Sequence, residues 1–176
     1  MDAFLSGRPC LDLTTTLRVR HREQPVETLR TPADLGAWIA ASGLCEAPVE
    51  VDAGGLRRAR ALREAVYRIG HPAGAPAPDD VAALNAAASR PPLVPRLVDG
   101  TVYRSGGLDA VLSTLARDAI DLFGGPHAAR VRECAHPDCS RLFLDVSHAG
   151  RRRWCGMAAC GNKAKSAAYR RRQEQP

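Results

Sequence analysis

Four cysteines near the C-terminal end of the chain have the residue type and spacing of metal ligands. They form two pairs, Cys134-x4-Cys139 and Cys155-x4-Cys160, with 15 residues between the pairs. Zinc binds four thiolates tetrahedrally, and such a closed shell leaves no position for a catalytic water. The spacing therefore predicts one structural Zn2+, whose binding supplies the folding free energy of a module too small to build much of a core.

Two disulfides or four free thiols are alternative interpretations of these cysteines. They are less favoured, because Cys10 and Cys45 stand alone and the six cysteines do not form an evenly spread disulfide framework. This usage favours a reducing compartment. A histidine, His136 or His148, could replace one cysteine as a ligand, although four thiolates already complete the shell.

The excess positive charge of the chain lies in the same region. The chain has 176 residues and a formal net charge of +6. Residues 1–129 hold 14 Arg against 15 Asp and Glu, whereas residues 130–176 hold 11 Arg and Lys against 4 Asp and Glu. Such asymmetry is typical of proteins that bind nucleic acid. The candidate contacts are Arg151, Arg152, Arg153, Asn162, Lys163, Lys165, Arg170, Arg171 and Arg172.

Most of these cations would contact phosphates, which position a protein on DNA without reading its sequence. Asn162, Lys163 and Lys165, at the start of a predicted helix, are candidates for contacts to base edges. Alternatives are a solvated basic face, an RNA contact, or a zinc-stabilised module for protein interaction or dimerisation. A lone finger binds weakly, so a homodimer would be physically sensible. We expect Trp154 to pack beside the zinc rather than to stack on bases.

The sequence around the cysteines predicts a treble-clef zinc finger over residues 127–176. Residues 141–145 alternate like a strand, and residues 147–150 look like its turn. Good helix formers fill residues 162–172. A knuckle, a hairpin and a helix that begins at the second cysteine pair make up this arrangement.

Residues 1–126 predict a separate α+β domain in which helices predominate over short strands. A short strand is expected over residues 9–16, followed by a charged loop. Asp99-Gly100 predicts a type I′ turn between residues 96–98 and 101–103. Gly124-Gly125-Pro126 is the expected domain boundary. Capping residues, apolar periodicity and terminal glycines predict helices over residues 31–43, 55–69, 79–88 and 108–123.

Several function classes are disfavoured by what the sequence lacks. It contains no phosphate loop, no Gly-x-Ser-x-Gly and no clustered His and carboxylates, so we do not expect an enzyme. It also has no apolar stretch that resembles a signal peptide or is long enough to span a bilayer. We therefore expect a cytoplasmic protein without a membrane partner.

Motifs in the C-terminal region also resemble those of a known finger. Cys134-x4-Cys139, Arg141-Leu-Phe-Leu-Asp145, Arg151-Arg-Arg-Trp-Cys155 and Cys160-Gly-Asn-Lys163 together resemble the CGNR-type zinc finger at the C-terminus of bacterial ABATE-domain proteins. The tetrapeptide that names this finger ends in Arg. Here Lys163 keeps the charge but loses a planar, bidentate contact to phosphate or guanine.

Upstream motifs are similar to the ABATE domain. They are Cys10-Leu-Asp-Leu13, Thr31-Pro-Ala-Asp-Leu35 with Trp38, and Ala61-Leu-Arg-Glu-Ala-Val-Tyr67. The family often has Asn at the position of Thr15. The resemblance implies a stress-responsive bacterial transcription regulator, in which an N-terminal domain that senses a small ligand is joined to a DNA-binding finger.

Three residues of the N-terminal region are candidates for that ligand site. Asp12 and Thr15 could face a pocket, or could bond to neighbouring backbone. His21, between two arginines, could bind an anion, or could lie in a surface loop.

Overall fold

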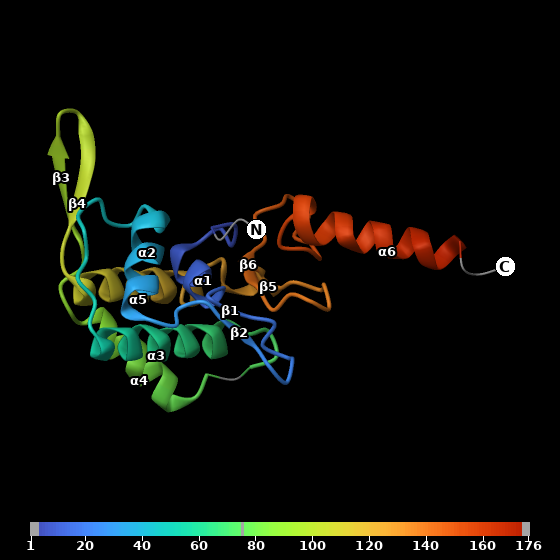
Figure 1. The fold of residues 1–176 in the computed structure, drawn as a ribbon, viewed down its shortest axis with the longest axis horizontal. Coiled ribbons are helices and arrows are strands. Elements are labelled where there is room, and N and C mark those ends of the chain that lie inside the picture. Colours follow the sequence, from blue (N-terminus) through green and yellow to red (C-terminus); the bar gives the residue numbers. More distant parts are fainter. Residues whose placement is uncertain (1–3, 75, 174–176) are drawn as a thin grey trace.

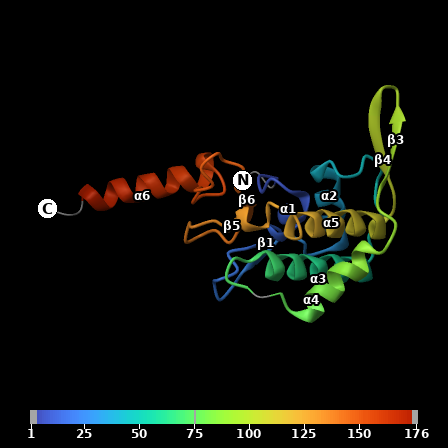
Figure 2. The same ribbon diagram turned by 180° about the vertical axis from the view of Figure 1, so that it is seen from behind.

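The computed structural model describes residues 4–74 and 76–173, without the side chains of Ala159, Ala168, Tyr169, Arg171 and Arg172. A body of packed helices carries a slender hairpin at one end and a projecting helix at the other (Figures 1 and 2). The helices of the body are α1 (Pro9–Thr14), α2 (Pro32–Ser42), α3 (Ala53–Gly70), α4 (Pro78–Ala88) and α5 (Leu108–Phe123). None of the helices in the described ranges is both long and apolar enough to cross a bilayer.

Short strands pair only as two-stranded antiparallel sheets within the described residues. The pairs are β1 (Leu17–Arg18) with β2 (Val26–Glu27), β3 (Val94–Val98) with β4 (Thr101–Ser105), and β5 (Val131–Glu133) with β6 (Leu142–Leu144). A 3-10 turn, η1 (Ala128–Arg130), precedes β5. The chain continues from β6 to a π-type turn, η2 (Met157–Gly161), and to the projecting helix α6 (Asn162–Gln173).

The four helices expected in the N-terminal region are confirmed. At the start of α2, the side chain of Thr31 accepts a hydrogen bond from the backbone of Asp34, and the Asp34 carboxylate accepts one from the backbone of Thr31. Gly43 ends this helix with φ of 66°, a left-handed conformation that glycine adopts without a side-chain clash. These boundaries follow local signals, which explains why the sequence predicts them.

The strand expected over residues 9–16 is wrong, because residues 9–14 form helix α1. Pro9 occupies the first turn of the helix, where its missing N–H costs nothing. Every residue from Cys10 to Thr14 is buried, without the alternation of a half-exposed strand. The hydroxyls of Thr14 and Thr15 each donate to a carbonyl three residues earlier, at 2.7 Å. The threonines therefore support the end of a buried helix, and part of the following charged loop forms the β1–β2 pair.

The predicted type I′ hairpin is confirmed. Asp99 and Gly100 both have positive φ, 47° and 77°, as this turn requires. Strands β3 and β4 extend from it and project from the helical body (Figure 1). Their apolar side chains are largely exposed, with Leu97 at 78%.

One hydrophobic core extends from the helices into the C-terminal hairpin. Helix α1 packs against α3 and α5, and α4 packs against both of these helices. Leu142 and Leu144 of β6 join this core, together with Val131 of β5. Between them, Phe143 belongs to a second cluster that it forms with the cysteines. Strand β6 therefore has one face in the core and one face at the cysteine site.

The hairpin of the finger differs from the one expected. Strand β6 pairs with β5, which precedes Cys134, and not with a segment beyond residues 147–150. The first cysteine pair lies in the connection between the two strands. The backbone N–H of Cys134 donates to the carbonyl of Arg141 at 2.9 Å and extends the ladder towards the metal ligands.

Candidate metal centre and basic surface

The four predicted ligands converge on one point. The Sγ atoms of Cys134, Cys139, Cys155 and Cys160 lie within 4.8 Å of one another. Two of these distances are 3.9 Å, from Cys139 to Cys155, and 3.7 Å, from Cys155 to Cys160. A tetrahedral site with Zn–S bonds of about 2.3 Å places its sulfurs about 3.8 Å apart. All six cysteines of the chain are described, and none is in a disulfide. The donor set therefore fits one zinc ion.

The ionisation of the thiols also favours a cation. The pKa of Cys134 is lowered, because the thiols of Cys139 and then Cys155 donate hydrogen bonds to its sulfur. The pKa of Cys155 is raised, first by its contact with Cys134, and burial raises the pKa of Cys160. One thiolate therefore opposes the formation of the next. A divalent cation removes this opposition, and thiolate ligands suit zinc.

Neighbouring backbone and rings hold the cysteine cluster in place. The N–H of Cys155 points at the sulfur of Cys134, with 3.5 Å between the atoms. The N–H of Ala135 donates to the carbonyl of Arg153 at 2.9 Å and ties the two knuckles together. Phe143 is fully buried in the cluster, and Trp154 packs against it as expected. The core of the finger therefore consists of the Phe143 ring and the four cysteine sulfurs, and its stability depends on the bound metal.

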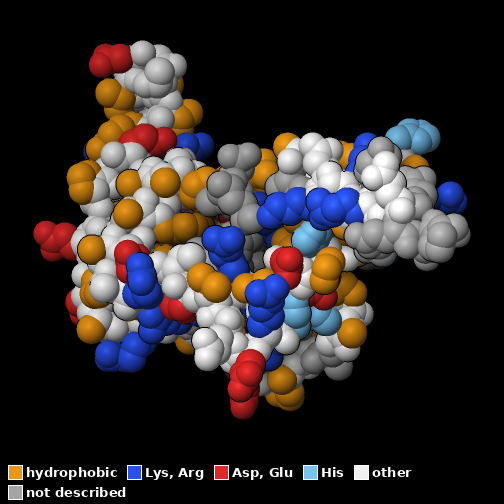
Figure 3. Space-filling view, turned by 45° about the vertical axis from the view of Figure 1, so that its right-hand side comes forward, with side chains coloured by type: hydrophobic (Ala, Val, Ile, Leu, Met, Phe, Trp, Pro, Cys, Tyr) orange, Lys and Arg blue, Asp and Glu red, His pale blue; other side chains and the backbone are white. Residues whose placement is uncertain are grey.

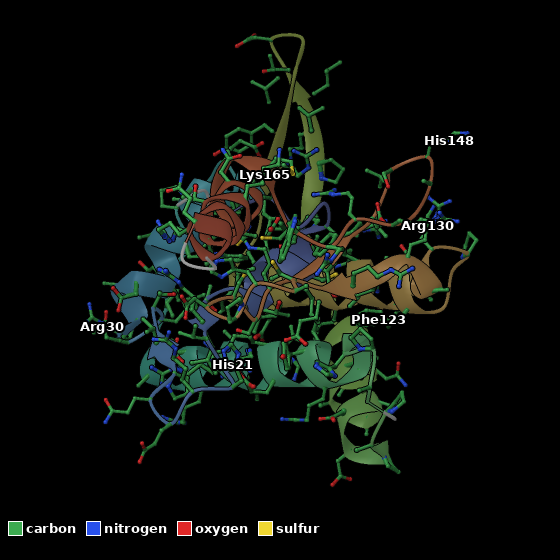
Figure 4. All side chains as sticks on the ribbon, turned by 90° about the vertical axis from the view of Figure 1, so that its right-hand side faces the viewer. His21, Arg30, Phe123, Arg130, His148 and Lys165 are labelled. Carbon is green, nitrogen blue, oxygen red and sulfur yellow. The ribbon has the colours of Figure 1, made fainter. Side chains whose placement is uncertain are left out.

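Neither of the two histidines considered as alternative ligands belongs to the cluster. His136 accepts a hydrogen bond at Nδ1 from the backbone of Asp138, at 3.1 Å, and its ring meets Trp154 edge-on at 6.4 Å. His148 is exposed on a loop that points away from the body (Figure 4). Four cysteines thus account for the ligand set of this site.

The loop between β6 and the second knuckle is organised by a buried carboxylate, which ends the Arg141–Asp145 motif and for which the sequence predicted no role. Asp145 is fully buried. Its carboxylate accepts from the N–H and hydroxyl of Ser147, at 3.0 and 2.6 Å, and from the N–H of Arg152, at 2.8 Å. These hydrogen bonds, that of the Ser147 hydroxyl first, lower the pKa of Asp145 to about 2. The carboxylate stays ionised and fixes the loop.

The three arginines of the run have different surroundings. The guanidinium of Arg152 donates to the carbonyl of Cys155 at 2.7 Å and lies over the ring of Phe143, 4.9 Å from its centre. Arg151 is exposed. Arg153 is also exposed, with its guanidinium 5.1 Å from the ring centre of Trp154. Arg152 therefore supports the zinc site, while its two neighbours face solvent.

Helix α6 begins at Asn162, two residues after the last ligand, and projects from the body (Figure 1). Asn162, Lys163, Lys165 and Arg170 are exposed on it, and Figure 4 shows Lys165 on its outer side. The backbone of residues 171 and 172 is helical, whereas the side chains of Arg171 and Arg172 lie outside the described part. Lys and Arg side chains are visible over the face shown in Figure 3, including the region of this helix.

Further cations beside the loop of residues 145–150 were not predicted. Arg130 donates to the carbonyls of Asp145 and Ser147, at 3.4 and 3.3 Å. Arg132 donates to the carbonyl of Gly150 at 3.2 Å and is exposed. Both precede the first knuckle, and the charge excess from residue 130 onward is the signal that could have included them.

The three ligand candidates of the N-terminal region lie next to the finger. The Asp12 carboxylate accepts from the N–H of Ser6 at 2.9 Å. The hydroxyl of Thr15 donates to the carbonyl of Asp12. A ring nitrogen of His21 contacts the carbonyl of Pro137 in the first knuckle. The alternative that Asp12 and Thr15 bond to neighbouring backbone thus has direct contacts in its favour, and their role towards a ligand stays a prediction.

Comparison with known families agrees with this arrangement. The model of the ABATE family, described as "Putative stress-induced transcription regulator", matches residues 7–126. The model of the CGNR zinc finger matches residues 130–173, which include all four cysteines of the cluster. No curated protein matches the chain. The first match covers well over half of the sequence, and this protein therefore belongs to the ABATE family and carries a C-terminal CGNR zinc finger.

Proposed function

We propose that the protein is a transcription regulator that binds duplex DNA through its zinc finger. The observation that carries this proposal is the placement of α6, which starts two residues after the last zinc ligand and projects with Lys163, Lys165 and Arg170 exposed. Its 12 residues make a helix about 18 Å long, and the diameter of an α-helix with its side chains, about 10–12 Å, fits the major groove, which is about 12 Å wide. Zinc would fix the start of this helix relative to the arginine loop.

The side-chain contacts divide the proposed interface into two roles. Arg151 and Arg153 are free to contact phosphates, because both are exposed on a loop fixed by Asp145. Asn162 and Lys163, at the start of α6, are proposed to reach base edges. Such a protein would act inside the cell as a regulator and not as an enzyme, with zinc in a structural role. The family resemblance adds a stress signal or a small ligand as the input.

A salt series tests this proposal. The double variant Arg151→Ala with Arg153→Ala is compared with the wild type and with Arg57→Ala, which removes an exposed arginine of α3. Each lost phosphate contact lowers the slope of log affinity against log salt by about 0.9, so we expect a slope reduced by nearly 2 in the double variant. Binding that is insensitive to salt, or equal slopes for all three proteins, would contradict phosphate contacts by these residues.

A dimerisation role has one observation in its favour. The projecting β3–β4 hairpin exposes apolar side chains, among them Val94 at 54%, Leu97 at 78% and Val102 at 51%. Two-stranded sheets are marginal alone, and contact with a second copy would bury these residues. Sedimentation of the wild type beside the variant Leu97→Lys would decide: a dimer that the substitution dissociates supports this role, and a monomer in both cases removes it.

A further inference from the structure

We propose that residues Asp12, Thr15 and Val19–Arg22, which we call the latch, couple the ABATE domain to the first zinc knuckle, so that zinc retention by the finger depends on the folded N-terminal domain. The regulatory meaning of this coupling rests on the proposed function, because a signal in the N-terminal domain would then alter the DNA-binding finger. The coupling itself does not require DNA.

The turn after β1 makes three direct contacts with the knuckle. The backbone N–H of Arg20 donates to the hydroxyl of Ser140 at 3.1 Å, and Ser140 is 5% exposed. A ring nitrogen of His21 contacts the carbonyl of Pro137. The guanidinium of Arg22 pairs with the carboxylate of Asp138. Ser140, Pro137 and Asp138 all lie within or beside the first cysteine pair, so the turn holds the segment that carries two zinc ligands.

The backbone of the turn is held in an unusual conformation. Val19 has φ of 48°, which a β-branched residue adopts only when the surroundings impose it. The N–H of Arg22 donates to the carbonyl of Val19 at 3.0 Å and closes the turn. Contacts with the knuckle on one side and with α3 on the other side would maintain this conformation.

The other end of the latch is fixed to α3. The guanidinium of Arg20 pairs with Glu64 at 2.5 Å and lies over the ring of Tyr67, 4.0 Å from its centre. Glu64 is also paired with Arg63, which is 3% exposed and binds Glu27 through two hydrogen bonds of 2.7 Å. A displacement of α3 would therefore be transmitted to the turn, because separating these charged groups would leave buried charges unpaired, which is strongly destabilising.

Helix α1 faces the finger as well. Asp12 is 7% exposed, and although burial raises the pKa of this carboxyl, the nearby charge of Arg141 acts in the opposite direction. Thr15 lines a small cavity of about 30 Å³ together with Cys139 and Arg141. Of the N-terminal residues proposed for ligand sensing, Thr15 thus shares a cavity with the knuckle, and Asp12 is under the influence of the charge of Arg141, which follows the knuckle.

Strand β6 provides the structural reason why the coupling acts in both directions. Its Leu144 donates its N–H to the carbonyl of Ser6 at 2.8 Å and is buried in the helical core, whereas Phe143 is buried among the zinc ligands. Loss of zinc would remove the packing around Phe143. Leu142 and Leu144, on the opposite face of the same strand, would then be held less firmly in the helical core. Zinc therefore contributes to the stability of the N-terminal domain.

Exchanging the charges of Arg22 and Asp138 tests whether the N-terminal domain affects zinc retention by the finger. The variants Arg22→Glu, Asp138→Arg and their combination are prepared in the full zinc-loaded chain, with Arg57→Glu on α3 as a matched change of charge. Zinc release to a chromophoric chelator is the readout. We expect each single variant to release zinc about fivefold faster than the control, and the combination to recover most of this loss. Equal release rates, or a combination no slower than the singles, would overturn the proposal.

The two tryptophans allow the second direction to be measured. In a Trp154→Phe background, only Trp38, which is 9% exposed in the helical core, reports unfolding by fluorescence. We expect removal of zinc to lower the melting temperature reported by Trp38 by about 4 °C or more. An unchanged Trp38 transition on zinc removal would show that the domains are independent. Neither readout involves DNA, so a failure of DNA binding alone would leave this result interpretable.

Discussion

The buried carboxylate of Asp145 accepts a hydrogen bond from the backbone of Arg152, seven residues later, at 2.8 Å. The same carboxylate accepts two hydrogen bonds from Ser147. One side chain therefore fixes both ends of the loop that carries Arg151. The arginine run is a defined surface because of this acid, and not because of its own sequence.

Replacing Asp145 by Asn tests this role. The amide keeps one acceptor for Ser147 but presents an NH2 group to the N–H of Arg152, which is then unpaired. We expect DNA affinity to fall about threefold to tenfold while the chain still binds one zinc, as measured by fluorescence anisotropy and metal analysis. The control is Asp109→Asn, a half-exposed acid of α5. Affinity equal to that of the control would contradict the role of Asp145.

The ion pairs of α3 predict a dependence of stability on pH. Burial raises the pKa of Glu64, but hydrogen bonds and charge from Arg20 and Arg63 outweigh it and hold the pKa below the ordinary 4.5. The ionised carboxylate of Glu64 therefore contributes to the free energy of unfolding above pH 4.5, and this contribution is lost as the pH falls through the lowered pKa. We expect Glu64→Gln to cost about 2 kcal/mol at pH 7 and progressively less in acid.

The measurement is the Trp38 melting temperature between pH 7 and pH 3, in the Trp154→Phe background. Zinc leaves the protein with Glu64 and the Glu64→Gln variant over the same acidic range. The difference between their melting temperatures therefore reports the effect of the carboxylate alone. A difference that stays constant down to pH 3 would show that Glu64 has no lowered pKa in the folded chain.

Arg152 and Arg151 should differ in what they contribute. Arg152 donates to the carbonyl of Cys155 and covers Phe143, so Arg152→Ala removes packing at the zinc site as well as a charge. We expect this variant to release zinc faster and to bind DNA more weakly, whereas Arg151→Ala affects only DNA binding. Zinc release and anisotropy on both variants check this. Equal zinc release would place Arg152 with the phosphate contacts instead.

The features that could be predicted from the sequence are those with local signals. The zinc ligands follow from their spacing, and α2 follows from the cap at Thr31 and the stop at Gly43. Helix α1 was missed because three threonines suggested a strand, while the burial of Leu11 and Leu13 on all sides depends on α3 and α5. Tertiary packing overrides local propensity in this segment.

Contacts between distant segments could not be derived from patterns along the chain. The partner of β6 precedes the first knuckle, and the turn at Arg20 meets Ser140, 120 residues later. Asp145 ends one of the motifs of the family resemblance, but its role could not be predicted, because an acid after an apolar strand is ordinary until its three hydrogen bonds are known. The site was therefore predictable in its ligands and charges, but not in the residues that position them.

The position of Lys163 leads to a prediction that separates charge from geometry. Lys163 ends the tetrapeptide that begins at Cys160, and it is exposed at the start of α6, so Lys163→Arg should leave the fold unchanged. A guanidinium can bind O6 and N7 of guanine through two parallel hydrogen bonds, which an ammonium cannot reproduce. We expect affinity for the preferred DNA to rise about fivefold or more, with an unchanged salt slope because the charge is the same. Lys165→Arg makes the same chemical change two residues later and controls for a general effect of arginine. Equal gains in both variants would show that the effect is not specific to Lys163, and no gain in either would place Lys163 outside the groove.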